Sequence, residues 1–224
     1  RKILLKFNNS MKDLSSYRKD YSKHMLDDKK TPSNPFVLFN LWFNELEKNS
    51  DINEINSMVL NTIGNDGFPK GRVVLLKYFS EEGFVFFTNY RSEKSLSIMN
   101  NNKVSLTFFW QGSERQVVIK GKAEKTDEKL NENYFKIRPF ESKIAAHVSK
   151  DQSSVISSRE VIDENFTDLY SKFKDKDIPK PEYWGGYIVK PVEYEFWQGR
   201  KNRLHDRIKY SFNNSEWEKC RLSP

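Results

Sequence analysis

The chain has 224 residues, of which 37% are hydrophobic and 14% aromatic, enough to build one substantial core. Its 38 Lys and Arg exceed its 31 Asp and Glu by seven, which suits anionic ligands, but the charged stretches interleave both signs and disfavour a nucleic-acid track. Cys220 is the single cysteine, which excludes an intrachain disulfide and a multi-cysteine zinc site and fits a reducing, cytoplasmic location. No apolar run approaches the roughly 20 residues of a membrane span, so no membrane partner is expected.

The beginning of the chain predicts an arm, residues 1–33 and partly flexible, that precedes a single domain over residues 34–224. Residues 1–10 are basic and lack the apolar stretch of a secretory signal, although a trimmed organellar presequence stays open. Residues 11–33 are polar and are expected to order against the body or a partner, with Arg18 and Tyr21 as functional candidates. Asn34 as N-cap and Pro35 as first helical residue then predict a helix to about Lys48. Its buried face is expected to carry Leu38, Leu41, Trp42 and Leu46.

The remaining pattern is mainly that of β-strands with flanking α-helices. Alternating apolar residues and turn signals predict strands over residues 57–63, 71–79, 84–89, 103–110, 115–125, 186–197, 207–212 and 216–222. Helices are predicted over 92–99, 127–137 and 158–173. A small antiparallel barrel is the expected architecture, because closure removes the exposed edges of successive hairpins.

The densest polar cluster alternates Arg203, His205 and Arg207, which would lie on one face of a strand. Two guanidinium groups suit an anion or an electron-rich ring, and an imidazole exchanges protons near neutral pH. An exposed strand end with an ion pair to Asp206 explains the same pattern equally well.

A second set of cations brackets the strand that holds Arg72 and Lys77. Their odd spacing points them to opposite faces, and taken alone they are best explained as strand-end cations that reach solvent. Lys94 and the first amides of the helix that begins after Ser92 could hold a phosphate, although a plain capped helix start is commoner.

A third cluster contains Tyr134 and Arg138, one helical turn apart, with Ser142 just beyond. These are three phosphate-type donors, but a helix C-terminus with an arginine that complements the helix dipole would look the same. No phosphate-binding glycine loop, nucleophile elbow or metal-ligand spacing is present, so no metal is predicted.

Several motifs in order along the chain, from about Arg18 onward, resemble the pyridoxamine 5'-phosphate oxidase family. They are Arg72-Val-Val-Leu-Leu-Lys77, Phe87-Thr-Asn89, Glu114-Arg-Gln-Val117, Tyr134-Phe135 with Arg138-Pro139, Trp184-Gly-Gly186, Phe196-Trp-Gln-Gly199, Arg203-Leu-His-Asp-Arg207 and Arg221-Leu-Ser-Pro224. The spacing from Phe196 to Arg207 is the most specific of them.

The resemblance implies a split β-barrel that forms a homodimer with FMN at the subunit interface. It implies that FMN is contacted by Arg72, Val73, Leu75, Leu76, Lys77, Phe87, Thr88, Lys94, Gln116, Gln152, Ser153, Trp197 and Arg207. It assigns the substrate to Arg18, Tyr21, Lys77, Tyr134, Arg138, Ser142, Arg203 and His205, of which Arg203 and His205 are the catalytic residues.

The activity that the resemblance implies belongs to vitamin B6 metabolism. Pyridoxamine 5'-phosphate and pyridoxine 5'-phosphate are oxidised to pyridoxal 5'-phosphate by hydride transfer to FMN, with O2 as the electron acceptor that gives H2O2. The alternatives are a flavin reductase-like split-barrel enzyme acting on another substrate, or a non-enzymatic module that binds pyridoxal phosphate or nucleic acid.

The chain departs from the family pattern at two places. Glu93 stands where the family usually has an arginine that binds phosphate, and Arg91 is the nearest replacement cation. The segment Ser149-Lys150-Asp151-Gln152-Ser153 is one residue longer than its counterpart in the family.

Overall fold

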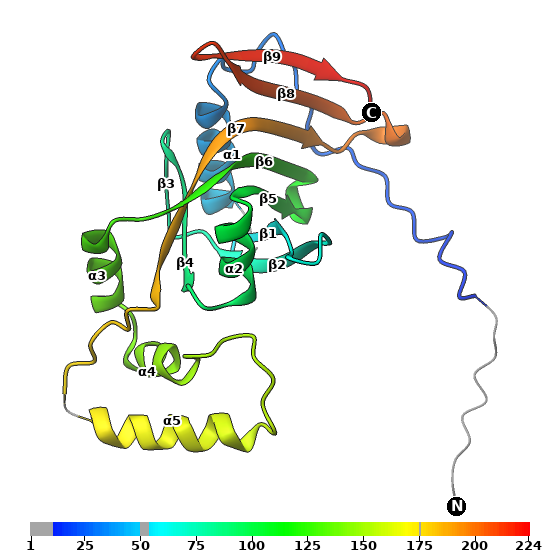
Figure 1. Ribbon diagram of the computed structural model, residues 1–224. Helices are drawn as coiled ribbons and strands as arrows, with labels where there is room; N and C mark the ends of the chain where they lie inside the picture. The colour runs from blue at the N-terminus through cyan, green and yellow to red at the C-terminus, as the bar shows by residue number, and fades with distance from the viewer. Residues whose placement is uncertain (1–10, 50–53, 175) are drawn as a thin grey trace, which may run out of the picture.

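The computed structural model describes residues 11–49, 54–174 and 176–224 (Figure 1), so the predictions for residues 1–10 lie outside the described part. The strands are β1 Ser57–Ile63, β2 Pro69–Leu75, β3 Tyr78–Ser80, β4 Gly83–Asn89, β5 Lys103–Trp110, β6 Arg115–Lys125, β7 Trp184–Gln198, β8 Asp206–Asn213 and β9 Glu216–Leu222. The helices are α1 Pro35–Asn49, α2 Glu93–Asn100, α3 Glu128–Lys136, α4 Phe140–Val148 and α5 Glu160–Phe173, with the 3-10 turns η1 Gln111–Ser113 and η2 Lys201–Arg203.

All these strands join one antiparallel sheet, in the order β2-β1-β5-β6-β7-β4-β3, with β8 and β9 added at β7. The hairpins predicted from the turn signals are present, and β1, β5 and β6 have the predicted bounds. The sheet curls into a half-barrel with helices on its outside and at its open side, which confirms the predicted split-barrel class.

Strand β7 is the longest and holds the sheet together. One of its edges pairs with β6, while its other edge pairs first with β4 at residues 184–189 and then with β8 at residues 193–198. Pro191 lies between these two stretches, where the second edge has no partner strand and a missing backbone N–H costs least. The register against β6 shifts at the same level, between Lys120 and Gly121, where β7 has one extra residue as a bulge.

The main core lies between α1 and the inner face of the curved sheet. Asn34 caps α1 as predicted, since its Oδ1 accepts a hydrogen bond from the Phe36 amide at 2.9 Å. Phe39 contacts aromatic rings from β3, β4 and β5, namely Phe79, Phe84, Phe108 and Trp110. Helix α1 therefore fills the open side of the half-barrel.

The buried face of α1 differs from the prediction at Leu41, which is 54% exposed. Leu38, Trp42 and Leu46 are buried as predicted, and Phe43 is buried on the same face. At about 100° per residue, Leu41 lies on the far side of Leu38 from Phe43, outside the buried arc.

Two further predictions of secondary structure are corrected. The strand predicted over 71–79 is broken, because the Leu76 amide donates to Asn56 at 2.9 Å whereas the Lys77 amide donates to Val85 of β4 at 2.8 Å. The chain thus leaves the β1 edge and joins β4 within two residues. Helix α4 was not predicted, and it begins directly after Pro139.

A smaller apolar cluster joins α3, α4 and α5 to the start of β7. It consists of Phe135, Ile144, Ala146, Ile178 and Trp184, with Phe166 and Phe173 of α5 packed against it. These helices lie together at the end of β4 and β7 that is remote from β8 and β9 (Figure 1). None of the helices in the described ranges is both long enough and apolar enough to cross a membrane.

Candidate active site

The first cavity, of about 610 Å³, lies between the ends of β2 and β4 and the helices α3 and α4. Ten of its lining residues were predicted as ligand contacts: Val73, Leu75, Lys77, Phe87, Thr88, Lys94, Tyr134, Arg138, Ser142 and Gln152. Segments far apart in the sequence thus converge on one cavity. This cavity is called the phosphate cavity below, after the ligand that the family resemblance predicts for it.

Arg138 dominates one side of the phosphate cavity. Its Nη2 donates to the Ser142 carbonyl at 2.8 Å, and its guanidinium carbon lies 4.7 Å from the centroid of a Trp184 ring. Burial lowers the pKa of Arg138, which shows that the guanidinium is partly removed from water. The other guanidinium donors are available to an anion in the cavity.

Tyr134, Arg138 and Ser142 reach the phosphate cavity by a different route from the one predicted. Helix α3 ends at Lys136, and Pro139 starts α4, so these residues are not on one continuous helix. The tight connection between α3 and α4 brings them together all the same. The Tyr134 ring stacks on Phe87 at 4.1 Å between centroids, and Phe87 stacks on Trp184 at 5.3 Å.

Lys94 lines the opposite side of the phosphate cavity, and Arg72, a predicted FMN contact that does not line the cavity, lies near Lys94. Lys94 Nζ donates to Thr88 Oγ1 at 3.2 Å and to Gln152 Oε1 at 3.4 Å. Burial, and next the nearby positive charge of Arg72, lower the pKa of Lys94. Arg72 Nη1 donates to Leu60 O at 3.1 Å and to Thr62 Oγ1 at 2.8 Å, and burial lowers its pKa as well. Two partly desolvated cations so close together favour an anion between them.

The negative charge of Glu93 raises the pKa values of Arg72 and Lys94, but its carboxylate makes its ion pair elsewhere. Its carboxylate binds Lys70 Nζ at 2.6 Å on the exposed surface, and its amide donates to Ser153 Oγ at 3.3 Å. Arg91 does not line the phosphate cavity. Its Nη1 lies 3.8 Å from Asp151 Oδ1, and its guanidinium stacks over the Tyr183 ring.

Leu76 was predicted to contact FMN, but it does not line the phosphate cavity, because its side chain is buried in the main core. Val73, three residues earlier in β2, is by contrast 66% exposed. Ser92 is the N-cap residue of α2, as predicted, but its side chain makes no capping hydrogen bond.

The second cavity, of about 570 Å³, lies between the arm and the segment that connects β7 to β8. It is lined by Arg18, Tyr21, Arg203 and His205, which are predicted substrate residues, together with Tyr17, Lys19, Asp20, Arg200 and Asn202. The His205 ring lies 4.6 Å from Trp197 and 5.9 Å from Tyr21, and Tyr21 meets Trp197 edge-on at 5.7 Å. This second cavity is called the histidine cavity below.

The geometry around His205 selects one neutral tautomer. The backbone N–H of Arg200 donates to His205 Nδ1 at 3.1 Å, so Nδ1 accepts and the proton of the neutral ring resides on Nε2. Burial, and next the positive charge of Arg203, lower the pKa of His205, and Asp206 opposes them. The lowered pKa favours the neutral ring, and the Nε2–H of that ring is the group that can donate.

Arg203, His205 and Arg207 do not share one strand face, which corrects the prediction. Asn202 and Arg203 have positive φ angles of 58° and 61°, and β8 begins only at Asp206. Arg207 lies within β8, where it binds Glu195 at 2.8 Å and the Ser223 carbonyl at 2.7 Å. It also lies in register with Trp197, which is paired in turn with Gln116 of β6.

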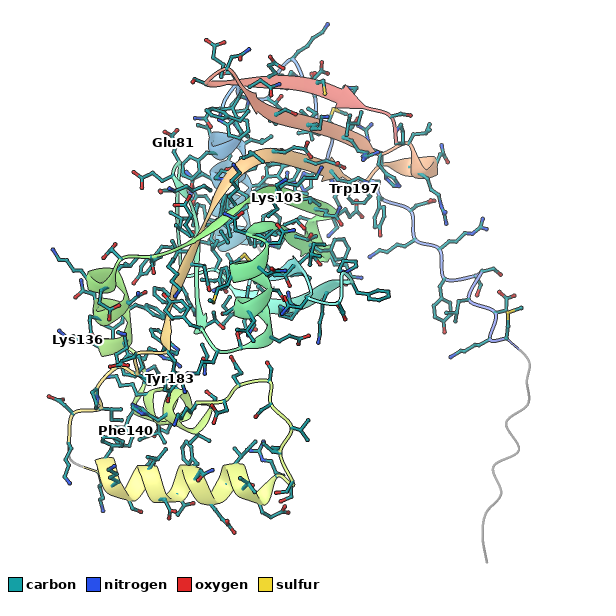
Figure 2. The ribbon with its side chains drawn as sticks, viewed as in Figure 1. Glu81, Lys103, Lys136, Phe140, Tyr183 and Trp197 are labelled. Atoms are coloured by element: carbon teal, nitrogen blue, oxygen red, sulfur yellow. The ribbon has the colours of Figure 1, made fainter. Side chains whose placement is uncertain are left out.

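The two cavities have no lining residue in common. Figure 2 shows Trp197 well separated from Tyr183 and Phe140, which mark the end of the molecule with α4. Strand β7 connects the two places, with Trp184 at the phosphate cavity and Trp197 beside the histidine cavity. In one copy of the chain, the predicted catalytic pair is thus remote from the predicted phosphate ligands.

Sequence reasoning gave no role to several residues that line the phosphate cavity. Trp184 stood in a quoted motif, and its position before two glycines at the start of a strand was the available signal. Asn89 is 3% exposed, and its Nδ2 donates to the carbonyls of Ser149 and Lys150, which anchors the loop that carries Gln152. The described ranges contain no group of three or more His, Cys, Asp or Glu side chains that could hold a metal ion.

Comparison with known proteins decides the family. Residues 45–173, more than half of the chain, match the family model described as pyridoxamine 5'-phosphate oxidase. The chain belongs to the pyridoxamine 5'-phosphate oxidase family. Residues 184–224 match a second model of this family, the pyridoxine 5'-phosphate oxidase C-terminal dimerisation region. The resemblance seen in the sequence motifs is confirmed.

Members of the family from several bacteria align with almost the whole chain. A pyridoxine/pyridoxamine 5'-phosphate oxidase of Flavobacterium johnsoniae is 55% identical over 95% of this chain and 100% of that protein. One of Leptospira biflexa is 45% identical over 96% of this chain and 100% of that protein.

Among solved structures, PhzG from Burkholderia lata in complex with tetrahydrophenazine-1-carboxylic acid is similar at a TM-score of 0.83, with 25% identity, over 89% of this chain and 98% of that chain. An FMN-binding protein from Nostoc punctiforme, related to pyridoxamine 5'-phosphate oxidase, has the same fold at a TM-score of 0.63 and 16% identity, over 87% and 98% of the two chains.

Proposed function

We propose that this chain oxidises pyridoxamine 5'-phosphate and pyridoxine 5'-phosphate to pyridoxal 5'-phosphate, with FMN as cofactor and O2 as electron acceptor. The observation that carries the proposal is the phosphate cavity, where Lys77, Tyr134, Arg138 and Ser142 converge from three parts of the chain. Lysine, arginine and hydroxyl donors are the groups that bind a phosphate monoester. The names of the 55% and 45% identical relatives support the same substrates.

Lys94, Thr88 and Gln152 on the other side of the phosphate cavity, with Arg72 and Ser153 near them, fit the phosphate of FMN. Arg72 and Lys94 are cations whose pKa values burial lowers, so an anion would restore the electrostatic stabilisation that they lost on leaving water. Thr88, Gln152 and Ser153 supply hydroxyl and amide groups beside them. The chemistry that FMN supplies when bound is acceptance of a hydride from the 4' carbon of the substrate and its transfer to O2 as H2O2.

A homodimer would unite the two cavities. Residues 184–224, which match the dimerisation region, carry Trp197, Arg203, His205 and Arg207. In the proposed dimer, each active site takes the phosphate cavity from one copy and the histidine cavity from the other. A two-fold axis makes two such sites, because it exchanges the contributions of the two copies.

The residues of the histidine cavity orient the substrate in this proposal. Arg203 places a guanidinium over the pyridine ring, and His205 donates its Nε2–H to a polar group of the substrate while Arg200 holds Nδ1. Because Nδ1 already accepts from the Arg200 amide and Nε2 of the neutral ring carries the proton, His205 in this proposal orients the substrate and relays protons without being an obligatory base.

An anaerobic absorbance experiment tests the proposed function. The purified protein, reconstituted with FMN, is expected to show a flavin spectrum that bleaches when pyridoxamine 5'-phosphate is added without oxygen. Admission of air should restore the flavin spectrum, consume O2 and yield a product that absorbs as an aldehyde. Bleaching by NADH but not by pyridoxamine 5'-phosphate would favour a flavin reductase. Failure to retain FMN, with salt-sensitive binding of RNA or DNA, would favour a binding module.

A further inference from the structure

The arm is fixed to the body through a buried carboxylate. Glu114, at the start of β6, is 3% exposed, and its Oε2 accepts hydrogen bonds from the backbone amides of Ser22 at 2.8 Å and Lys23 at 3.0 Å. Among the described residues, Glu114 forms no ion pair. Burial of a carboxylate is costly, so its hydrogen bonds to the arm are what offset its desolvation.

The main chain of Glu114 fixes the body side of the same contact. Its φ angle of 54° is in the left-handed region, and its carbonyl accepts hydrogen bonds from the Gly199 amide at 2.7 Å and from Gln198 Nε2 at 3.1 Å. One residue therefore ties the arm to the end of β7, immediately after Trp197. A left-handed conformation at a non-glycine residue persists only where its surroundings hold it.

Gly199 provides the space that the arm occupies. A Cβ atom at this position would lie 2.7 Å from both Cβ and Cγ of Tyr21, closer than carbon atoms approach. Tyr21 consequently rests on a bare stretch of backbone, with its ring against Trp197 and His205. Five residues after Tyr21, the Leu26 amide donates to Asp206 Oδ2 at 3.0 Å, so residues 21–26 are held at both ends.

We propose that Glu114 and Gly199 form the docking site of residues 21–26, and that Glu114 is a positioning residue that acts on the substrate through Tyr21. Docking places Tyr21 against His205 and brings Arg18 to the rim of the histidine cavity. This role rests on the proposed function, in which the histidine cavity receives the substrate. Glu114 itself does not line that cavity.

Hydrogen exchange of the arm amides tests the docking without any substrate. In Glu114→Gln, a neutral oxygen replaces the carboxylate, and the amides of Ser22 and Lys23 should exchange about tenfold faster or more, because charge-assisted hydrogen bonds are roughly twice as strong as neutral ones. Asp66→Asn is the matched control, since Asp66 Oδ1 accepts from the Phe68 amide in the remote β1–β2 turn. Unchanged exchange at Ser22 and Lys23 in Glu114→Gln would overturn the docking.

Steady-state kinetics test the positioning role. Glu114→Gln should raise the KM for pyridoxamine 5'-phosphate about fivefold or more and change kcat and FMN affinity less than about twofold, because only binding through the arm is weakened. In a Tyr21→Ala background the same substitution should have no further effect on KM. An equal rise of KM in both backgrounds would refute action through Tyr21.

Gly199→Ala provides an independent variant in case Glu114→Gln does not fold. It leaves the carboxylate in place but displaces Tyr21. Like Glu114→Gln, it should raise the KM for pyridoxamine 5'-phosphate and speed hydrogen exchange of the arm amides. Normal KM and exchange in a folded Gly199→Ala protein would contradict the docking site. If the wild-type protein did not turn over pyridoxamine 5'-phosphate, the proposed function would fail, while the exchange experiment would still decide whether the arm docks on Glu114.

Discussion

Replacement of Arg138 by methionine should remove recognition of the substrate phosphate and leave the rest of the site in place. The methionine side chain keeps an apolar body against Trp184, over which the guanidinium now lies at 4.7 Å. The hydrogen bond from Arg138 Nη2 to the Ser142 carbonyl is lost, but that carbonyl is on the first turns of α4 and the helix retains its own bonds. The charge is the main quantity that changes.

The expected loss follows from the strength of one hydrogen bond between charged groups. Such a bond contributes about 1.5–3 kcal/mol, which corresponds to a decrease of roughly 10- to 150-fold in kcat/KM for pyridoxamine 5'-phosphate. Pyridoxamine without the phosphate does not use this bond, so its kcat/KM should change less than about twofold. The ratio of the two specificity constants, measured by aldehyde formation, is therefore the informative quantity.

Arg159→Met is the matched control for this substitution. Arg159 is the N-cap residue that precedes α5. Its side chain is 74% exposed and pairs with Asp163 of α5, so its loss should alter neither specificity constant. A decrease of the same size for the phosphorylated and the unphosphorylated substrate in Arg138→Met would show that Arg138 maintains the cavity and does not bind phosphate.

Three further predictions concern the cofactor, the dimer and pH. Arg72→Ala should mainly weaken FMN retention, measured by ultrafiltration, whereas Arg203→Ala should lower turnover much more than flavin content; wild-type turnover from Arg203→Ala would contradict this division. Mixing the Arg72→Ala protein, depleted of FMN, with Arg203→Ala and allowing subunit exchange should restore roughly a quarter of wild-type activity, since half of the dimers would have one intact site. No recovery would place the whole site in one chain. The pKa of His205 lies below its usual value of 6.5, so the acidic decline of kcat/KM that depends on protonation of His205 should occur below that pH. This decline should disappear in His205→Asn. A decline above pH 6.5 would refute the assignment.

A fourth prediction concerns the acid at position 93. Glu93→Gln removes a negative charge beside Arg72 and Lys94, whose pKa values it raises, so FMN should bind a few-fold more tightly at low salt. Titration of the apoprotein with FMN, followed by flavin fluorescence, measures the change. Weaker binding in this variant would mean that the ion pair with Lys70 is needed to shape the site.

The sequence predicted the elements whose cause is local. The bounds of β1, β5 and β6 follow from alternation and turn residues, and the start of α1 follows from Asn34 and Pro35. The break after β2 has no local signal, because it arises when the Lys77 amide takes a partner in β4. Helix α4 was missed because the proline that starts it was taken as the end of the preceding helix.

The candidate site was predictable from motifs but not from periodicity. The lining of the phosphate cavity agrees with ten of the residues that the family resemblance implied. The alternation of Arg203, His205 and Arg207 suggested one strand face, yet the positive φ angles at Asn202 and Arg203 turn the backbone first. Glu114 and Ser22 are 92 residues apart in the sequence, and no sequence pattern predicts the hydrogen bond between them.

The length of β7 has a consequence for the spacing of the two active sites of the proposed dimer. Its first residues belong to one site and its last residues to the other, so each copy contributes one continuous hydrogen-bonded strand that extends from site to site. A shift of this strand along its axis would move Trp184 and Trp197 together. The separation between the parts of the two sites that one copy supplies is therefore set by the paired backbone of β7.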